Sequence, residues 1–348
     1  MPWQRAILPG RGKWWARALQ VIRSRAALHP GKAVRISTGA LLPDGAAAVI
    51  LQEDIARNGD RIALTGDAPE PPHKHIRPEG LDFRERDLLL PAGTRIGPAQ
   101  LALAITSGHS ALTVRRLPRL AVIDSGDELL ASGETCAPHQ IPASNGAMLA
   151  ALAAQIPCVI DRLGPVADTM EAIAQVLARA ESADLIVTSG GASVGDHDLI
   201  RPALEAWGAK IDFWRIAIKP GKPLLVATRA RKQGHQIILG LPGNPVSSHV
   251  TAFLFMLPLL RAMLGAAQPL PRAIHSALSA PLKPGGSRRE FLRAQWDGQS
   301  IAAQSLQDSG ALSSLANSNA LIDRAADAPE ARIGDEVCAF LLENGGMA

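Results

Sequence analysis

The sequence predicts an α/β central domain with a mostly parallel, doubly wound sheet, flanked by an N-terminal β-rich module and a small C-terminal β domain. Three observations lead to this prediction. The chain has 348 residues, more than one typical domain holds. Apolar strand-like runs alternate with helical segments in residues 116–264. Residues 1–115 and 270–348 instead carry short apolar runs separated by Gly and Pro.

The composition excludes several classes of protein. Apolar residues make up 47% and charged residues 20%, which is typical of a globular chain. The net charge of +4 is too small for a general nucleic-acid surface. Cys136, Cys158 and Cys338 are scattered, so they indicate neither a disulfide framework nor a zinc site and fit a reducing compartment. The N-terminus has no apolar segment of the secretory type, and the most apolar stretch, 250–260, is too short to span a bilayer. We therefore expect a cytoplasmic protein with no nucleic-acid or membrane partner.

The first module shows strand-like runs between turn residues. Residues 1–30 are basic and weakly patterned. We expect strands at 34–37 and 47–52, followed by short apolar runs at 61–66 and 88–98 that are typical of a β-rich module, and a short helix at 99–108.

The central part alternates buried-type strands with helices, and the tail returns to strands. In the central part we expect strands at 120–123, 184–188, 211–218, 224–228 and 237–241, and helices at 145–155, 170–180, 196–207 and 246–263. Ser144 or Asn145 would cap the first of these helices. A Pro-rich linker at 265–273 precedes three further strands at 289–296, 320–325 and 336–342.

Ligands of open α/β sheets bind at the carboxyl ends of the strands. Three loops at such ends are rich in small and polar residues: 125–128 (SGDE), 188–198 (TSGGASVGDHD) and 241–247 (LPGNPVS). The second is the richest, because it holds Ser189, Gly190, Gly191 and Ser193 between a strand and a helix. Glycine lets backbone N–H groups turn towards an anion, and a helix start favours negative charge. A plain strand-to-helix turn would explain the same residues.

Carboxylates follow two of these loops. Asp127 and Glu128 end the first, and Asp196 and Asp198 end the second. Acids beside an anion-binding loop commonly hold a divalent cation that bridges to phosphate. Acids at a helix start are also favoured by the helix dipole alone.

The segment KPGKP places two lysines around one turn. Pro220 and Gly221 fit the centre of a type II turn, which would bring Lys219 and Lys222 together. Arg215 lies four residues before Lys219 and would share its face of a strand. These cations favour an anionic ligand over a solvated surface. In the following PGNP segment, Asn244 or Ser247 would cap a helix, and Pro242 and Pro245 would alternatively form a rigid wall for a ligand.

Taken together, these motifs resemble those of the MoeA family, which acts in molybdenum-cofactor synthesis. The segments occur in the family's order: RISTGALLPDGAAAVI, PAGTRIGPAQLALAITSGH, PRLAVIDSGDEL, DLIVTSGGASVGDHD, FWRIAIKPGKPLL, GLPGNPVSS and SRREFLRAQ…DSGALSSLANSNALI. The resemblance covers about residues 18–345 and implies the fold described above.

The resemblance implies a reaction in which molybdate is inserted into adenylated molybdopterin, with Mg²⁺-dependent release of AMP. It implies a homodimer, and a molybdopterin adenylyltransferase as a possible partner. The implied catalytic residues are Asp127, Glu128, Asp184, Asp198, Lys219 and Lys222, and the implied metal ligands are Glu128 and Asp198. The implied substrate-binding residues are Thr38, Ser189, Gly190, Gly191, Ser193, Gly195, Arg215, Pro242, Asn244, Pro245, Arg288 and Ser309.

The sequence also departs from the family pattern. It begins without the family's PPFDNSAMDGYA segment, an acidic segment near the metal. Ala47 stands where the family has Asp, Asp124-Ser125 stands for Ser-Thr, and Ala143 replaces another Asp. Three hypotheses follow: an active transferase, a catalytically impaired relative that binds molybdopterin or a full-length partner, and a general nucleotide-binding protein.

Overall fold

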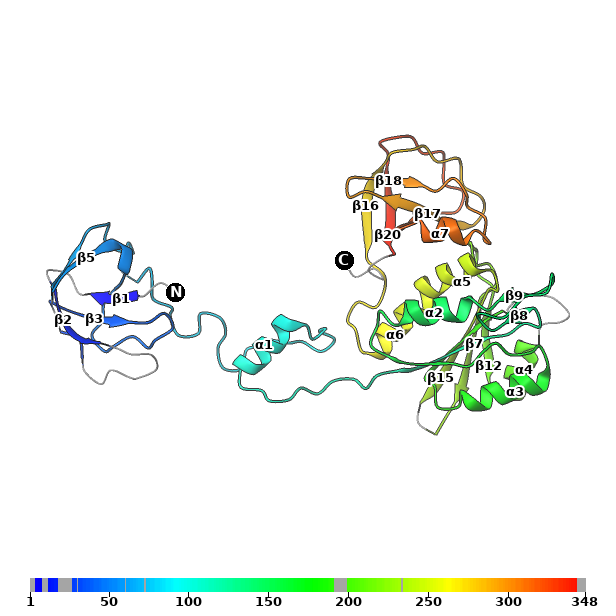
Figure 1. The fold of residues 1–348 in the computed structure, drawn as a ribbon, viewed down its shortest axis with the longest axis horizontal. Helices are drawn as coiled ribbons and strands as arrows, with labels where there is room; N and C mark the ends of the chain where they lie inside the picture. The colour runs from blue at the N-terminus through cyan, green and yellow to red at the C-terminus, as the bar shows by residue number, and fades with distance from the viewer. Residues whose placement is uncertain are drawn as a thin grey trace. The chain divides into compact units, whose positions relative to one another are not determined.

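A computed structural model describes residues 4–7, 12–17, 27–29, 31–59, 61–71, 73–190, 199–232 and 234–342. The chain divides into two compact units, Met1–Leu89 and Leu90–Ala348 (Figure 1). The three-part division at 1–115, 116–264 and 270–348 stays a prediction, since the central and C-terminal parts form one unit by this measure.

The N-terminal unit is built on a six-stranded sheet in the order β4-β1-β3-β2-β6-β5. Its strands are β1 (Gln4–Ile7), β2 (Gly12–Arg17), β3 (Lys32–Ile36), β4 (Val49–Leu51), β5 (Ile55–Asn58) and β6 (Arg61–Leu64), with a 3₁₀ turn at Gln52–Asp54. Strands β3, β4 and β6 confirm the expected β-rich module. Strands β1 and β2 lie in the stretch where we expected no pattern.

The apolar run 88–98 forms no strand, because Pro91 and Gly93 interrupt it and the chain there consists of turns and irregular segments. Helix α1 (Pro98–Thr106) follows, with Pro98 at its first position, where the missing N–H costs nothing. The expected helix at 99–108 is confirmed.

The central sheet has the order β10-β7-β11-β15-β14-β12. Strands β10, β7, β11 and β15 are parallel, and β14 and β12 continue the sheet antiparallel at one edge. The bounds are β7 (Arg119–Asp124), β10 (Val159–Arg162), β11 (Leu185–Ser189), β12 (Lys210–Trp214), β14 (Leu225–Ala230) and β15 (His235–Leu241). The mostly parallel sheet is as predicted.

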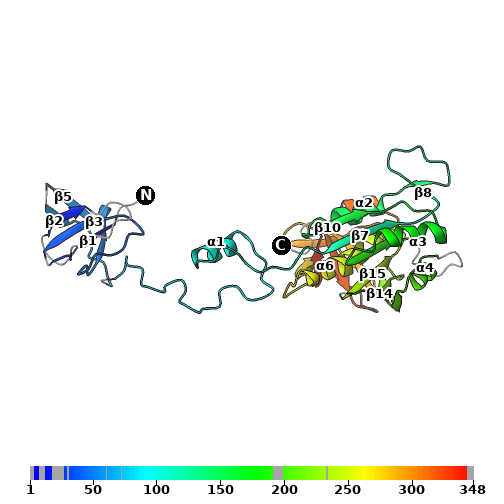
Figure 2. The same ribbon diagram turned by 90° about the horizontal axis from the view of Figure 1, so that it is seen from below.

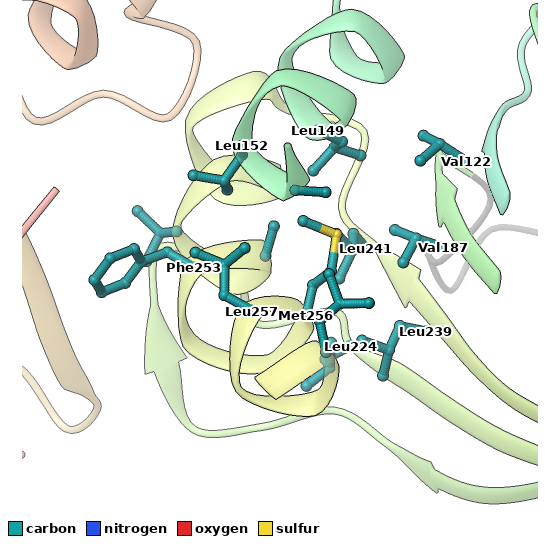
Figure 3. Packing of buried hydrophobic residues seen from close by; sticks show 14 of the residues in the cluster. Val122, Leu149, Leu152, Val187, Leu224, Leu239, Leu241, Phe253, Met256 and Leu257 are labelled. Atoms are coloured by element: carbon teal, nitrogen blue, oxygen red, sulfur yellow. The ribbon is translucent and has the colours of Figure 1, made fainter. Parts of the chain in front are cut away.

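Helices cover both faces of this sheet (Figure 1). Helix α2 (Asn145–Ala153) and the segment α5 (Pro245–Thr251), a π-helical stretch (Ala252–Met256) and α6 (Leu257–Met263) lie on one face. Helices α3 (Met170–Arg179) and α4 (Ile200–Ala206) lie on the other. Figure 3 shows Phe253, Met256 and Leu257 of this segment in one buried cluster with Leu149 of α2 and Val187 of the sheet.

The helix Pro245–Met263 is long and apolar enough to cross a membrane, and 61% of its most apolar window is buried inside the protein. Burial against α2 and the sheet is typical of a core helix. A two-stranded ribbon, β8 (Leu129–Leu130) with β9 (Ile141–Pro142), adds to this domain. The loop after β8 stands out from the domain in Figure 2.

The expected strand 211–218 is wrong in its second half. Strand β12 ends at Trp214, and Arg215 has a φ of +97°, a left-handed conformation that breaks an extended strand. The chain then enters β13 (Ile218–Lys219), which pairs with β17 of another sheet. Arg215 and Lys219 therefore do not share one strand face.

The C-terminal domain is a strand barrel. Its strands are β16 (Ala273–Leu278), β17 (Arg289–Trp296), β18 (Ser300–Ala303), β19 (Ala320–Arg324) and β20 (Glu336–Leu341). They follow the order β17-β18-β16-β20-β19, and a β17–β19 pairing closes the ring. A short helix, α7 (Leu312–Ala316), precedes β19. The three expected strands are confirmed as β17, β19 and β20.

Candidate functional site

A cavity of about 690 Å³ opens where β7, β11 and β15 end. It therefore lies at the carboxyl ends of the parallel strands, as ligand sites of this fold class do. The lining comes from these strand ends, the β8–β9 ribbon, α2, the loop before α3, the KPGKP and PGNP segments, and α7. The lining residues are Asp124, Ser125, Glu128, Leu129, Ile141, Pro142, Ala143, Ser144, Asn145, Asp168, Ser189, Gly190, Pro223, Pro242, Gly243, Asn244, Pro245, Ser247 and Leu312.

The first turn of α2 ties the three strand ends together. The Asn145 amide nitrogen Nδ2 donates to Ser189 Oγ at 2.9 Å and to the Gly243 carbonyl at 2.7 Å. The backbone N–H of Gly146 donates to Asp124 Oδ2 at 2.9 Å. Asp124, at the end of strand β7, thus caps helix α2, while the side chain of Ser144 makes no cap hydrogen bond. Asn145, which we had considered only as a helix cap, instead braces the cavity.

Asp124 is the most enclosed charged group of the cavity. It is 4% exposed, and its second oxygen, Oδ1, is buried without a hydrogen-bond partner. A Cβ at Gly146 would come within 2.1 Å of Asp124 Oδ2, so only glycine leaves room for this contact. Burial raises the pKa of the Asp124 carboxyl, while the Gly146 hydrogen bond and the charge of Arg162 act in the opposite direction.

The glycine-rich loop is only partly within the described residues. Ser189 and Gly190 line the cavity, and Gly190 has a φ of +97°. A Cβ at Gly190 would lie 2.6 Å from the Ser125 carbonyl, which explains the glycine. The Gly190 N–H donates to the Leu241 carbonyl at 3.3 Å, so it joins two strand ends. Gly191, Ser193, Gly195, Asp196 and Asp198 lie outside the described residues.

Acidic side chains gather at one side of the cavity. Glu128 and Asp168 line it, and the Asp168 N–H donates to Asp127 Oδ1 at 2.9 Å. Partial burial, then the charges of Asp127 and Glu128, raise the pKa of the Asp168 carboxyl. The described residues hold no group of three metal-ligating side chains. Their lining side chains that carry charge are all acidic.

The PGNP segment forms another part of the cavity wall. Pro242, Asn244 and Pro245 all line the cavity. Helix α5 begins at Pro245 after Asn244, whose side chain makes no cap hydrogen bond. The backbone of Ser309, from the C-terminal domain, accepts a hydrogen bond from the Val246 N–H at 3.2 Å. The last domain thus reaches the edge of the cavity.

The KPGKP segment lies beside the cavity rather than in its wall, and only Pro223 contributes to the lining. Lys219 Nζ pairs with Glu290 Oε1 at 3.0 Å, and Lys222 is exposed. Arg288 Nη1 donates to the Ile218 carbonyl at 3.3 Å. The Arg215 N–H donates to the Leu224 carbonyl at 3.0 Å. We call Arg215, Lys219, Lys222 and Arg288 the basic rim.

One predicted residue, Asp184, lies elsewhere in the same unit as the cavity. Asp184 precedes β11 at the amino end of the sheet, the end opposite to the cavity. It accepts hydrogen bonds at 2.7–2.9 Å from Arg116, Arg231 and the Arg119 N–H, and the Arg116 bonds in particular hold its pKa well below the usual range. Asp184 is thus an ion-pair partner that does not line the cavity, and its expected catalytic role stays a prediction that this geometry does not support. Thr38 belongs to the N-terminal unit.

Four polar residues that line the cavity lie outside the loops that the sequence predicted as ligand sites: Asp124, Ser144, Asn145 and Asp168. Asp124 ends a buried strand directly before SGDE, so its position carried a usable signal. Asp168 had none, because it reaches the cavity from the loop before α3.

A doubly covered α/β sheet with a cavity at its strand ends, joined to a small barrel, is the architecture with which we compared known protein families. Family models match three stretches: "MoeA N-terminal region (domain I and II)" over 16–108, "Probable molybdopterin binding domain" over 121–262, and "MoeA C-terminal region (domain IV)" over 276–342.

Curated relatives agree with the family models. The chain is 33% identical to "Molybdopterin molybdenumtransferase 2" of Mycobacterium tuberculosis over 318 residues, which cover 89% of this chain and 77% of the relative. The chain therefore belongs to the MoeA family. It is also 36% and 35% identical to molybdopterin molybdenumtransferases of Nostoc sp. and Haemophilus influenzae. Those matches cover 69% and 75% of this chain but 55% and 64% of the relatives' lengths.

Solved structures give the same fold. A molybdopterin biosynthesis MoeA protein from Pyrococcus horikoshii superposes with a TM-score of 0.76 at 28% identity and covers 98% of this chain. That alignment covers 88% of the archaeal chain.

Proposed function

We propose that this protein inserts molybdate into adenylated molybdopterin and releases AMP. The observation that carries the proposal is the pairing of two unlike surfaces at one end of the sheet. An acidic cavity lies at the ends of β7, β11 and β15, and the KPGKP segment, which carries two cations of the basic rim, reaches the cavity lining through Pro223. The relatives' printed names, molybdopterin molybdenumtransferase, support this choice of substrates.

The acidic cavity suits the phosphates of the substrate only with a divalent cation. Its described charged lining residues are Asp124, Glu128 and Asp168, which by themselves repel an anion. Mg²⁺ is usually held by one or two carboxylates together with substrate phosphates, so Glu128 and Asp168 fit this role, with Asp198 as the further ligand expected from the sequence. When bound, Mg²⁺ would neutralise charge on the phosphates. Asn145 and Pro245 then hold the walls of the cavity in place around the ligand.

The basic rim suits the oxyanion. Lys219 and Lys222 present ammonium groups from one short segment, and Arg288 presents a guanidinium beside them. Such cations stabilise negative charge that develops during transfer. The polar residues of the cavity and the four cations of the rim support a proposal in which phosphate and molybdate bind at separate places in one site.

Partners follow from the same proposal. We propose a homodimer, a molybdopterin adenylyltransferase as the supplier of substrate, and a cytoplasmic location. Apolar side chains on and after α1 support a second copy as partner, because Leu101, Ile105 and Val114 are 52%, 63% and 69% exposed.

The test is a direct assay with molybdopterin adenylate, molybdate and Mg²⁺ that measures AMP. We expect AMP release that depends on both molybdate and Mg²⁺. Tight binding of molybdopterin adenylate without AMP release would instead favour the catalytically impaired relative. Tight binding of adenosine nucleotides alone would favour the general nucleotide-binding protein.

A further inference from the structure

A buried carboxylate lies against the basic rim. Glu290, the second residue of β17, is 7% exposed and faces Lys219 through the parallel pairing of β13 with β17. Its Oε1 accepts from Lys219 Nζ at 3.0 Å. The side chain of Lys219 is 52% exposed, so its remaining N–H donors stay accessible to a ligand.

A carboxylate at this position is unfavourable for a site that only has to bind an anion. A carboxylate beside cations removes one unit of positive charge and weakens attraction for a dianion. Burying it also costs free energy, which the Lys219 contact offsets only in part. The barrel contains a second pair of the same type, in which Arg289 Nη2 meets Asp323 Oδ2 at 2.5 Å and Asp323 is similarly enclosed. This second pair involves a residue of the same strand but no cation of the basic rim. Asp323 therefore serves as a control for a carboxylate with a purely structural role.

We propose that Glu290 is a positioning residue for the oxyanion, acting through Lys219. It holds the flexible lysine at one place and takes up part of its charge, so that the rim binds molybdate with moderate affinity. This inference rests on the proposed function of the basic rim. A lysine side chain carries four rotatable carbon bonds, and an anchored ammonium loses less entropy when an anion arrives.

The charge and the position of Lys219 respond differently to substitution. Glu290→Gln keeps an oxygen acceptor for Lys219 and removes the negative charge, so the rim gains one net positive charge. Molybdate binding should tighten about five-fold at low salt, and the gain should shrink as salt is added. Glu290→Asp keeps the charge and draws the carboxylate back by one methylene. It should weaken molybdate binding, because Lys219 is pulled with it.

The experiment measures molybdate affinity by calorimetry on the full chain, with thermal unfolding as a check that each variant folds. Lys219→Ala provides the background for a double-mutant cycle, in which Glu290→Gln should tighten molybdate binding clearly less than it does in the wild type, because only the direct effect of the lost charge remains. Asp323→Asn is the matched control, since it removes a buried carboxylate from the same barrel and should leave molybdate affinity unchanged. Each comparison is made at two salt concentrations.

The inference is overturned by an unchanged affinity in Glu290→Gln, by an equal change in the Lys219→Ala background, or by an equal change in Asp323→Asn. Wild-type protein that binds no molybdate also overturns it. AMP release on the same preparations separates the two proposals. If the wild type binds molybdate and releases no AMP, the proposed function fails, while the affinities still decide the role of Glu290.

Discussion

Two buried aspartates lie at opposite ends of the same sheet and have opposite surroundings. Asp184, at the amino end of β11, is met by Arg116, Arg231 and a backbone N–H. Asp124, at the carboxyl end of β7, accepts one hydrogen bond from Gly146 and keeps Oδ1 without a partner. Ion pairing lowers the pKa of Asp184, and burial raises the pKa of Asp124.

The difference separates residues that hold the fold together from residues left available to a ligand. At the amino end every acceptor of the carboxylate is used, so Asp184 closes a network that also fastens the chain before β7. At the carboxyl end the backbone groups of three strands are tied by α2, and carboxylates face a cavity. A buried acid is informative about ligands only when its partners are incomplete.

The largest expected effect is loss of stability at the closed end. Asp184→Ala removes the shared acceptor of Arg116, Arg231 and the Arg119 N–H, and we expect the free energy of unfolding to fall by about 4 kcal/mol. Denaturant unfolding measures this. Asp161→Ala is the control, because its pair with Arg119 is 3.5 Å long and about half exposed and should contribute little. A variant at Asp184 with normal stability and lost AMP release would restore its catalytic assignment.

A buried histidine, His249, provides the corresponding test for a basic side chain whose hydrogen-bond partners are incomplete. Its Nδ1 in α5 is buried without a partner, and burial lowers its pKa from 6.5 to about 4. The neutral form is favoured in the folded state, so this contribution is complete above pH 6.5 and is lost as the pH falls from 6.5 to 4. We expect a loss of about 3 kcal/mol over that window. His249→Gln should remove this part of the pH dependence, as urea unfolding at pH 7.5 and 4.5 would measure. If the free energy of unfolding changed equally between these two pH values in the wild type and in His249→Gln, the prediction would be wrong.

The fold was predictable wherever local pattern and tertiary packing agree. The buried runs of β7, β11 and β15 are apolar on both faces, so their strands and their parallel arrangement could be predicted from sequence alone. The split of 211–218 could not be predicted, because it depends on Arg215 adopting a left-handed φ and on β13 joining the barrel instead. Nor could the strand at Gln4–Ile7, which is defined by its partners β3 and β4.

The site was predictable as a set of loops and not as a set of contacts. Loop positions follow from where strands end, which places Glu128, Ser189 and Pro242 at one cavity. Partners follow from tertiary structure: Lys219 meets Glu290, 71 residues away, and Asp184 meets Arg116, 68 residues away. The sequence shows both pairs of residues but no rule that would join them.

A smaller effect is expected at the contact between α2 and β7. Gly146→Ala would place a Cβ 2.1 Å from Asp124 Oδ2, so the carboxylate must move and the cap of α2 weakens. We expect a loss of about 2 kcal/mol in the free energy of unfolding. Gly243→Ala is the matched control at the same cavity, because the nearest atom to its Cβ would be Gly190 Cα at 3.7 Å. Thermal unfolding compares the Gly146→Ala and Gly243→Ala variants. Equal melting temperatures would show that the stability of the protein does not depend on the Asp124 cap of α2.

The smallest effect concerns Asp124 itself and has the opposite sign to that of Asp184. A raised pKa means that the folded state binds the proton more tightly, so this contribution is present below pH 4 and is lost as the pH rises through the folded pKa. Asp124→Asn keeps an acceptor for the Gly146 N–H and never ionises. It should therefore be more stable than the wild type by about 1 kcal/mol at pH 7, with the difference fading towards pH 4. Urea unfolding across this range measures the difference. If the variant is instead less stable than the wild type at pH 7, the ionised Asp124 carboxylate has a stabilising partner in the folded protein. The two ends of the sheet would then both hold satisfied carboxylates and would differ only in the groups that satisfy them.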